Sequence, residues 1–171
     1  IAMKEKFVNL DFHQNFNLHN SCEQYKTTTL KKEDVLLFYN LIKKHIEEHD
    51  KDHRTLITTF KRINNLYHNY TQSGNKLFVI KNFNLLPIAC SGIGSFRGLH
   101  PSEGIGEIRD LVVDPMYRNQ GLGEKIFIKC INFARSYGYH RLYLEITPQM
   151  QIAQKLFLRK GFKAVKQLPE N

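Results

Sequence analysis

The six residues Arg118-Asn119-Gln120-Gly121-Leu122-Gly123 decide how this chain is interpreted. They follow an apolar segment, Ile108–Val113, and an Asp114-Pro115 turn, and they precede an amphipathic pattern over Glu124–Tyr137 that predicts a helix. The N–H groups of a first helical turn have no intrahelical partners, and the helix dipole adds positive charge there. Glycines let a backbone approach an anion closely, and Arg118 adds a cation suited to phosphate oxygens. The stretch therefore predicts a site for a diphosphate.

Two familiar phosphate-binding motifs do not fit this stretch. A P-loop has Lys followed by Ser or Thr after its last glycine, whereas Glu124 follows Gly123 here. A dinucleotide-binding fingerprint has a third glycine where this chain has Ile126. The remaining pattern, Arg-x-x-Gly-x-Gly, resembles the acyl-CoA pyrophosphate loop of the GNAT-superfamily N-acetyltransferases.

The flanking sequence extends this resemblance over residues 75–166. Glu107–Arg118 is similar to the family's strand and turn before the loop, and Leu142–Ile146 is a second strand. Ala153–Phe162 resembles the family's closing helix, with its Ala-x-x-Leu-Tyr-x-x-x-Gly-Phe pattern. The order of these blocks implies an α/β (α+β) fold of the GNAT type. Its central sheet is mixed but mostly antiparallel, helices flank it, and two central parallel strands splay apart.

The composition is that of a single globular domain. The chain has 171 residues, of which 42% are hydrophobic and 24% charged. No apolar run approaches the roughly 20 residues of a membrane helix. We expect residues 1–22 to be an N-terminal arm or added element, and residues 23–171 to form one acetyltransferase domain. Cys22, Cys90 and Cys130 are widely spaced without a CxxC motif, and Cys90 and Cys130 lie in apolar patterns. This favours buried free thiols at Cys90 and Cys130 over a disulfide framework, and a cytoplasmic location.

The formal net charge of +9 favours acidic partners, from nucleic acid to a polyanionic cofactor. The lysines are scattered and no nucleic-acid recognition signature occurs, so a basic nucleic-acid or ribosome-associated protein is the weaker rival interpretation. His45, His49 and His53 recur at helical spacing. Acidic residues lie among them, which favours a solvated helix face, and we expect no metal site.

Hydrophobic periodicity predicts the order β-α-α-β-β-β-α-β-α-β. The first strand is expected at Tyr25–Thr28, followed by a helix with an apolar stripe over Leu30–Ile46 and a cap at Thr29, and by a second helix over Arg54–Tyr70. The later strands are expected at Leu77–Ile80, Ile88–Gly94, Ile105–Val113, Arg141–Ile146 and Phe162–Lys166, and the later helices at Glu124–Tyr137 and Gln149–Lys160.

One expected element is missing. The GNAT family usually has a further strand after its Gly-Phe block, but only Lys166–Asn171 remain here. The sheet lacks that strand, the sequence is cut short, or another segment fills the place. Lys6–Leu10 and a neighbouring subunit are both candidates for that segment, and a homodimer would cover the exposed sheet edge.

The resemblance also implies a cofactor site, with acetyl-CoA as co-substrate. Its pantetheine would lie between the strands Ile105–Val113 and Arg141–Ile146, held by backbone groups of Leu111, Val112 and Val113. An interior strand would show the same apolar residues, and the two interpretations are compatible. The residues expected to bind the cofactor are Leu111, Val112, Val113, Arg118, Asn119, Gln120, Gly121, Leu122, Gly123, Glu124, Met150 and Phe157.

Acyl transfer to an amine requires a base, because an ammonium group has no lone pair. Glu107 lies where several family members carry a base glutamate, although it could instead be a surface residue paired with Arg109. Glu145, on the partner strand, is the second candidate. The family often protonates the leaving thiolate with a tyrosine at the position of Phe157. Here water or another tyrosine, such as Tyr143 or Tyr117, would serve instead, or the activity is low.

We therefore expect an N-acetyltransferase that transfers an acetyl group from acetyl-CoA to a primary amine by direct attack in a ternary complex. Phe157 and Met150, which replace a tyrosine and an asparagine common in the family, motivate a non-catalytic acyl-CoA-binding module as the alternative. The acceptor can be a small molecule or a peptide or protein amine. The parts expected to select it are the two early helices and the loop Arg97–Gly104.

Overall fold

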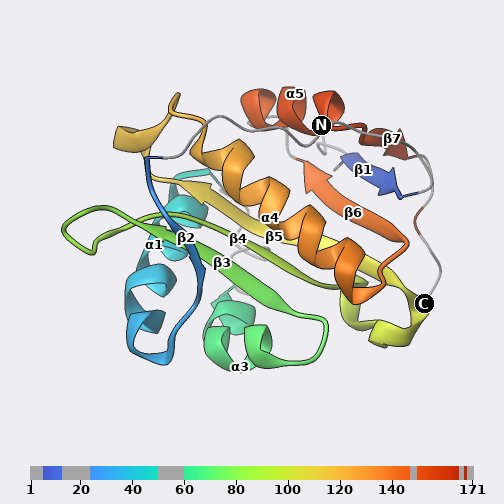
Figure 1. Ribbon diagram of the computed structural model, residues 1–171, viewed down its shortest axis with the longest axis horizontal. Helices are drawn as coiled ribbons and strands as arrows, with labels where there is room; N and C mark the ends of the chain where they lie inside the picture. Colours follow the sequence, from blue (N-terminus) through green and yellow to red (C-terminus); the bar gives the residue numbers. More distant parts are fainter. Residues whose placement is uncertain (1–5, 13–23, 50–59, 147–149, 166–167, 169–171) are drawn as a thin grey trace.

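The computed structural model describes residues 6–12, 24–49, 60–146, 150–165 and 168. The strands are β1 Lys6–Asp11, β2 Thr27–Thr29, β3 Lys76–Lys81, β4 Pro87–Ser95, β5 Ile105–Val113, β6 Arg141–Ile146 and β7 Lys163–Val165, and the helices are α1 Val35–His49, α3 Leu66–Thr71, α4 Leu122–Tyr137 and α5 Gln151–Arg159. The strands form one sheet in the order β2-β3-β4-β5-β6-β1-β7, with helices packed against it (Figure 1). Only β5 and β6 are parallel; the other neighbours are antiparallel. The predicted fold class is confirmed.

Alternation along the strands separates the two faces of the sheet. On β3, Leu77 and Val79 pack in a cluster with Phe38 and Ile42 of α1. Ile80 belongs to a second cluster with Leu122 and Ile126 at the start of α4. Helices α1 and α3 therefore cover one face of the β3–β4–β5 region. The other face carries α4, and α5 joins its core through Leu156 and Phe157.

The two parallel strands separate partway along their length. They pair from Ile105 opposite Arg141 to Ile108 opposite Leu144. Beyond this point β5 continues to Val113 and β6 to Ile146 without pairing between them. The splay that the sequence predicts is thus present, and it opens toward the end of β5 that leads into Arg118–Gly123.

The segment Lys6–Asp11 fills a place inside the sheet. As β1 it lies between β6 and β7, antiparallel to both, with Phe7 opposite Glu145 on one side and Val165 on the other. Val8 and Leu10 are each only 1% exposed and belong to the core beneath α4 and α5. Of the explanations considered for the missing strand, this chain uses its own N-terminal candidate segment.

Two details of the early region differ from the prediction. The helix expected over Arg54–Tyr70 is interrupted, because residues 60–63 are helical, Asn64 and Asn65 form a turn, and α3 begins only at Leu66. Asparagine is a poor helix former that favours turns, and residues 50–59 lie outside the described part of the chain. Thr29 caps no helix: it pairs with Phe78 as the end of β2, and α1 follows a short 3-10 turn.

The cysteine prediction is confirmed for the two thiols within the described residues. Cys90 and Cys130 are both buried and free, whereas Cys22 lies in a segment that the structure does not describe. None of the described helices is long and apolar enough to span a membrane.

Truncating Leu10 tests the position of β1. Leu10→Ala should lower the free energy of unfolding by about 2–5 kcal/mol, the range for removing a buried leucine side chain. Leu36→Ala is the matched control, because Leu36 on α1 is 68% exposed, and it should change stability by no more than about 0.5 kcal/mol. Urea unfolding of both variants makes the comparison. Equal, small losses would show that β1 is not part of the core.

Candidate active site

The predicted phosphate loop lies between β5 and α4. A short 3-10 turn, Pro115–Tyr117, follows the strand and is fixed by Asp114, whose carboxylate accepts from the Met116 N–H at 2.9 Å. Asn119 and Gly121 have positive φ values of 60° and 76°, so the chain turns sharply before the helix starts at Leu122. No side chain caps α4 at Gly121. The exposed turn at the start of a 16-residue helix is suited to an anion.

A buried cation holds the first turn of α4 in place. Lys160, at the end of α5, is 7% exposed, and its Nζ lies 2.5 Å from Oε1 of Glu124. Because a half-buried carboxylate there interacts with the helix dipole as well as with the lysine, this ion pair connects the end of α5 to the start of α4. Glu124 itself belongs to the predicted cofactor-binding set.

A β-bulge lies at the point where β5 leaves β6. Cys90 pairs with Val112 and Gly92 with Arg109, so β5 has one more residue than β4 in this interval. Asp110, within the bulge, has a φ of 55°, a conformation that costs a non-glycine residue of order 1 kcal/mol or more. Surrounding contacts must therefore hold Asp110 in place.

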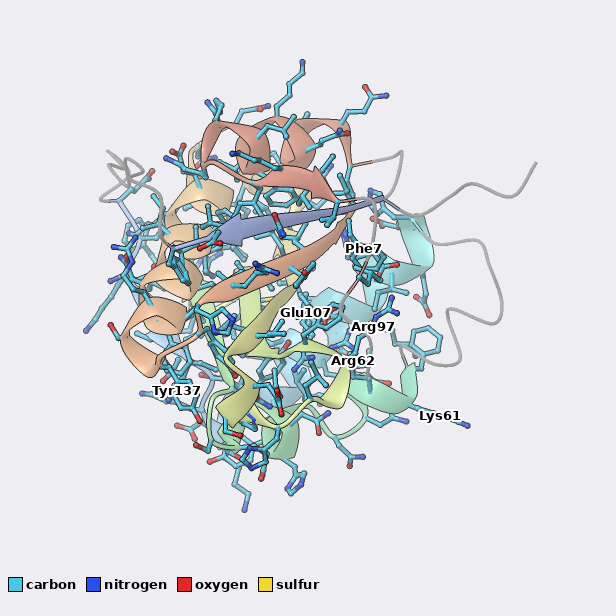
Figure 2. All side chains as sticks on the ribbon, turned by 90° about the vertical axis from the view of Figure 1, so that its right-hand side faces the viewer. Phe7, Lys61, Arg62, Arg97, Glu107 and Tyr137 are labelled. Carbon is cyan, nitrogen blue, oxygen red and sulfur yellow. The ribbon has the colours of Figure 1, made fainter. Side chains whose placement is uncertain are left out.

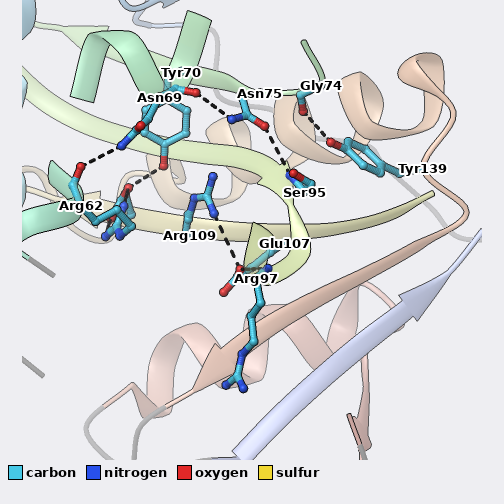
Figure 3. A network of polar contacts seen from close by, with 11 residues as sticks. Arg62, Asn69, Tyr70, Gly74, Asn75, Ser95, Arg97, Glu107, Arg109 and Tyr139 are labelled. Carbon is cyan, nitrogen blue, oxygen red and sulfur yellow. Dashed lines mark hydrogen bonds and ion pairs between the residues drawn. The ribbon is translucent and has the colours of Figure 1, made fainter. Parts of the chain in front are cut away.

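Those contacts are a network around the Asp110 carboxylate, whose side chain is only 3% exposed. Both terminal nitrogens of Arg62 donate to it at 2.5 Å, and the Tyr70 hydroxyl donates to Oδ2 at 2.5 Å. The Arg109 guanidinium lies 5.7 Å from the centroid of the Tyr70 ring. Figure 3 shows Arg62, Tyr70 and Arg109 converging from the helical region and β5. Charge-assisted, bidentate bonds of this kind are strong and directional.

The network sets the protonation state of its members. Burial opposes the charge on Asp110, but the Arg62 guanidinium and the Tyr70 hydroxyl bond hold the pKa of Asp110 below its ordinary value. Burial, reinforced by the Asp110 charge, raises the pKa of Tyr70 well above the usual range. At neutral pH the site therefore contains an ionised Asp110, a protonated Tyr70 and a charged Arg62.

Gly92 makes this network possible. A Cβ added to Gly92 would overlap the hydroxyl and ring of Tyr70, so only glycine leaves the path by which the tyrosine reaches Asp110 across β4. Sequence reasoning did not find Arg62, Tyr70 and Asp110. The available signal was Asp110 itself, a charged residue between Ile108 and the apolar run Leu111–Val113.

Glu107, the first predicted base, lies at the start of the splay and opposite Tyr143 in register. Its side chain is 14% exposed, and Oε2 lies 3.8 Å from Nη1 of Arg109. The same oxygen accepts from the Arg97 backbone N–H at 3.4 Å. The pairing with Arg109, which belongs to the alternative, non-catalytic interpretation of Glu107, is therefore present.

The other two catalytic candidates share the face of Glu107. Tyr143 is 3% exposed and its ring centroid lies 4.8 Å from that of Phe96. Glu145 is half-buried two residues further along β6, opposite Phe7 of β1. The structure thus brings Glu107, Tyr143 and Glu145 onto one face of neighbouring strands.

The remaining predicted cofactor residues divide into two groups. Val112 and Val113 pair with β4 but not with β6, and Leu111 precedes them within the bulge. Met150 lies half-buried at the start of α5. Phe157 is fully buried, with ring centroids 5.0 Å from Phe127 and 6.2 Å from Phe162. Phe157 therefore packs within the core.

The histidines on α1 form no metal site within the described residues, which contain no cluster of three or more potential ligands. The rings of His45 and His49 stack at 4.3 Å. Burial, with the nearby charges of His49 and Arg118, lowers the pKa of His45 to about 4. His45 is thus neutral at physiological pH; His53 lies outside the described residues.

A splayed parallel pair that leads into a glycine turn at a helix start is the arrangement expected of an acyltransferase of the GNAT type. The sequence matches the acetyltransferase (GNAT) family over residues 39–162, and the chain belongs to that family. It is 27% identical over 103 residues to the uncharacterised N-acetyltransferase YjgM of Escherichia coli (strain K12). That match covers 60% of this chain and spans 60% of the relative's length.

Solved structures show the same fold. An acetyltransferase of the GNAT family from Staphylococcus aureus MU50 superposes with a TM-score of 0.71 at 19% identity, covering 85% of this chain and 88% of that one. A GCN5-related N-acetyltransferase from Ralstonia eutropha JMP134 gives 0.67 at 20% identity, with 86% and 97% covered. A predicted acetyltransferase from Clostridium acetobutylicum, solved with acetyl-CoA, gives 0.62 at 17% identity, with 86% and 95% covered.

Asp110→Asn should destabilise the protein, because it leaves Arg62 without its carboxylate. We expect a loss of about 3 kcal/mol, the low end for a broken buried ion pair, since the Arg62 side chain is 32% exposed. The matched control is Asp11→Asn, which breaks a longer pair with Arg141 at 3.8 Å between side chains 35% and 42% exposed. That variant should lose no more than about 1 kcal/mol. Urea unfolding at pH 7 distinguishes the two, and equal losses would argue against a structural role for the network.

The same network predicts how stability depends on acid. A carboxyl group whose pKa is lowered by folding contributes stability above its unfolded pKa of about 3.9 and loses it as the pH falls through the folded value. Because the pKa of Asp110 is lowered, wild-type protein should lose stability more steeply below about pH 4 than Asp110→Asn does. Chemical denaturation at a series of acidic pH values measures both slopes. Parallel curves would contradict the assignment.

Proposed function

We propose that this chain is an N-acetyltransferase that transfers an acetyl group from acetyl-CoA to a primary amine by direct attack in a ternary complex. The observation that carries the proposal is the opening between β5 and β6 beyond Ile108 and Leu144, with the loop Arg118–Gly123 at its end and Glu107 at its start. Family membership supports acyl transfer in general. The C. acetobutylicum relative in the same fold was solved with acetyl-CoA, which supports that thioester as the donor.

The residues along this opening are suited to hold the cofactor. The β6-facing edge of Leu111–Val113 is not paired with β6, so its backbone groups can bond to the extended pantetheine. The exposed turn from Arg118 to Gly121 and the first amides of α4, through Glu124, would bind the pyrophosphate. Met150 would line the same region from α5, and Phe157 would support it from the core. Acetyl-CoA supplies an activated acyl group in a thioester.

Glu107 is the proposed base. An amine is protonated at neutral pH and gains its nucleophilic lone pair only after a base removes the proton. The Arg97 N–H and the Arg109 guanidinium orient one carboxylate oxygen of Glu107, leaving the second oxygen to accept the proton directly or through water. Glu145, on the same face of β6, is the second candidate for this role.

Tyr143 is the proposed proton donor to the departing thiolate. It lies opposite Glu107 on the partner strand, and its phenol can return a proton, whereas Phe157 cannot. Tyr117, the other tyrosine considered, has a structural partner, because its hydroxyl accepts from Asn82 Nδ2 at 2.9 Å. The backbone N–H of Val113 would stabilise negative charge on the thioester oxygen.

Neither described cysteine is suited to form a covalent acyl intermediate. Burial raises the pKa of the Cys130 thiol to about 12 and that of Cys90 well above its usual range. A thiol nucleophile must reach its thiolate form and contact substrate, and both groups are fully buried. This supports direct transfer to the amine.

A non-catalytic acyl-CoA-binding module is the second candidate. Its supporting observation is Phe157, which lies where many relatives carry a tyrosine and which the structure buries among Phe127 and Phe162. Calorimetric titration with acetyl-CoA followed by thioester turnover with a panel of amines separates the two. Binding without turnover favours the module, and turnover favours the enzyme.

Gly121→Pro should abolish acetyl-CoA binding measured by calorimetry. Proline removes an amide and cannot adopt the φ of 76° found at this position. Gly138→Pro is the matched control, because Gly138 has a φ of 112° at the opposite end of the same helix. Both variants should lose stability, but only the first should lose affinity. Acetyl-CoA binding retained by Gly121→Pro would remove the loop from the cofactor site.

Glu107→Gln should lower kcat at neutral pH by roughly 100-fold or more, the usual contribution of a general base, while acetyl-CoA affinity stays unchanged. The reason is that glutamine keeps the shape and the contact with the Arg97 N–H but accepts no proton. Raising the pH should partly restore the rate, because more of the amine is then neutral. The unchanged acetyl-CoA affinity, measured by calorimetry, is the control that the variant is folded. An unaltered rate for Glu107→Gln would move the base to Glu145.

A further inference from the structure

Arg97 lies beside the proposed base in an unusual conformation. It belongs to the turn Phe96–Gly98 after β4, is exposed, and has φ and ψ of 44° and 41°. A left-handed arginine costs backbone energy and is uncommon outside functional or tightly held turns. Its N–H donates to Oε2 of Glu107 at 3.4 Å. The backbone of Arg97 is thus tied to the carboxylate, while its side chain is directed elsewhere.

The side chain extends away from Glu107 toward β6 and β1, as Figure 3 shows. Its guanidinium carbon lies 5.0 Å from the ring centroid of Phe7 and 5.5 Å from that of Phe96. Figure 2 shows Phe7, Arg97 and Glu107 together on the same side of the molecule. Stacking on aromatic rings restrains the plane of a guanidinium and leaves the N–H groups at its edge able to donate.

No acidic side chain neutralises this cation among the residues that the structure describes. The ion pairs there join Arg62 to Asp110, Lys81 to Asp34, Arg109 to Glu107, Arg141 to Asp11 and Lys160 to Glu124. Arg109 and Arg62 near Glu107 are therefore matched by carboxylates, whereas Arg97 is not. An oriented arginine without a carboxylate partner is suited to a bidentate anion such as carboxylate or phosphate.

The separation between Arg97 and the base constrains the ligand. Phe7 lies on β1 and Glu107 on β5, with β6 between them. Neighbouring strands are about 4.8 Å apart, which gives roughly 10 Å across the two intervals. A ligand that presents an amine to Glu107 and an anionic group to Arg97 must therefore have several bonds between the two groups.

We propose that the acceptor is a small primary amine that carries a carboxylate or phosphate group several bonds from the amine, and that Arg97, stacked on Phe7 and Phe96, binds this anionic group. The inference rests on the proposed acetyltransferase function and specifies its acceptor class. It places acceptor selection on the β4–β5 turn and on β1, next to the proposed base. Polyamines and the lysine side chains of proteins lack such a group and would be poor acceptors.

The test compares amines that differ only in charge and length. Aminohexanoate, aminohexyl phosphate and aminohexanol share one chain length, and glycine places its carboxylate too close to its amine. With acetyl-CoA, kcat/KM should be roughly 10- to 100-fold higher for the better of the two anionic compounds than for aminohexanol, the range for one charge-assisted hydrogen bond. Glycine should be no better than aminohexanol. Comparing carboxylate with phosphate identifies which anion Arg97 prefers.

Variants then assign the preference to Arg97. Arg97→Gln should remove the preference for the anionic compounds over aminohexanol, measured as the ratio of their kcat/KM values in the same variant. Arg97→Lys, which keeps the charge but not the bidentate geometry, should retain part of it. The matched control is Arg135→Gln, because Arg135 is also exposed and stacked, 5.3 Å from the Phe12 ring, but on α4. Its preference should equal that of wild type.

Two kinds of failure are distinguishable. If wild type acetylates aminohexanol as well as aminohexanoate and aminohexyl phosphate, or if Arg97→Gln keeps the preference, the anion site is wrong and the acetyltransferase function stands. If no amine is acetylated, the proposed function fails, and calorimetric titration of the same compounds into CoA-saturated protein examines the anion site directly. Binding of an anionic compound that Arg97→Gln abolishes would support the site, and equal or absent binding in both proteins would overturn it.

Discussion

The buried carboxylate of Asp110 is the constraint on which the centre of this structure depends. The Asp110 side chain is only 3% exposed. A buried charge of this kind is tolerated only when cations and hydrogen-bond donors surround it. Arg62 and Tyr70 supply those partners from the helical region that follows α1. Asp110 in turn adopts the left-handed conformation of the bulge in β5. The helices and the sheet are thus joined at the residue where β5 leaves β6.

The bulge also decides which side chains reach the proposed acceptor face. Because the bulge places an additional residue in β5, both Arg109 and Asp110 contact Tyr70. Further along β5, Val112 packs with α1 and Val113 packs with the start of α4. Glu107 keeps the alternation and lies on the face of Tyr143. The proposed base is therefore surrounded by arginines whose charges are mostly matched by carboxylates. Arg97 forms no ion pair with the residues that the structure describes, which is why we propose it as a cation for the acceptor.

The features that the sequence predicted correctly are local ones. The glycine turn, the following helix and the order of strands and helices depend on residues close together in the chain, so their patterns are readable. The Asp110 network joins residues 40 and 48 positions apart, and no periodic pattern connects such residues. The second helix is split at Asn64 and Asn65, which are weak helix formers. The sequence prediction missed this split because a long apolar stripe continues across the two residues. The sequence left the position of β1 as one of several alternatives. The pairing of this strand with β6 and β7 depends on contacts throughout the sheet, which no local pattern shows.

The strand β1, Lys6–Asp11, completes the sheet, and it has two roles because its side chains point alternately to the two faces of the sheet. Val8 and Leu10 point into the core beneath α4 and stabilise the fold. Phe7 points to the opposite face, opposite Glu145, where it packs with Phe96 and Tyr143 and carries the Arg97 guanidinium. A strand from another part of the chain could also fill the core beneath α4, with different residues. It would then place a side chain other than Phe7 against the Arg97 guanidinium. The identity of the strand beside β6 thus couples the stability of the sheet to the chemistry proposed for the acceptor.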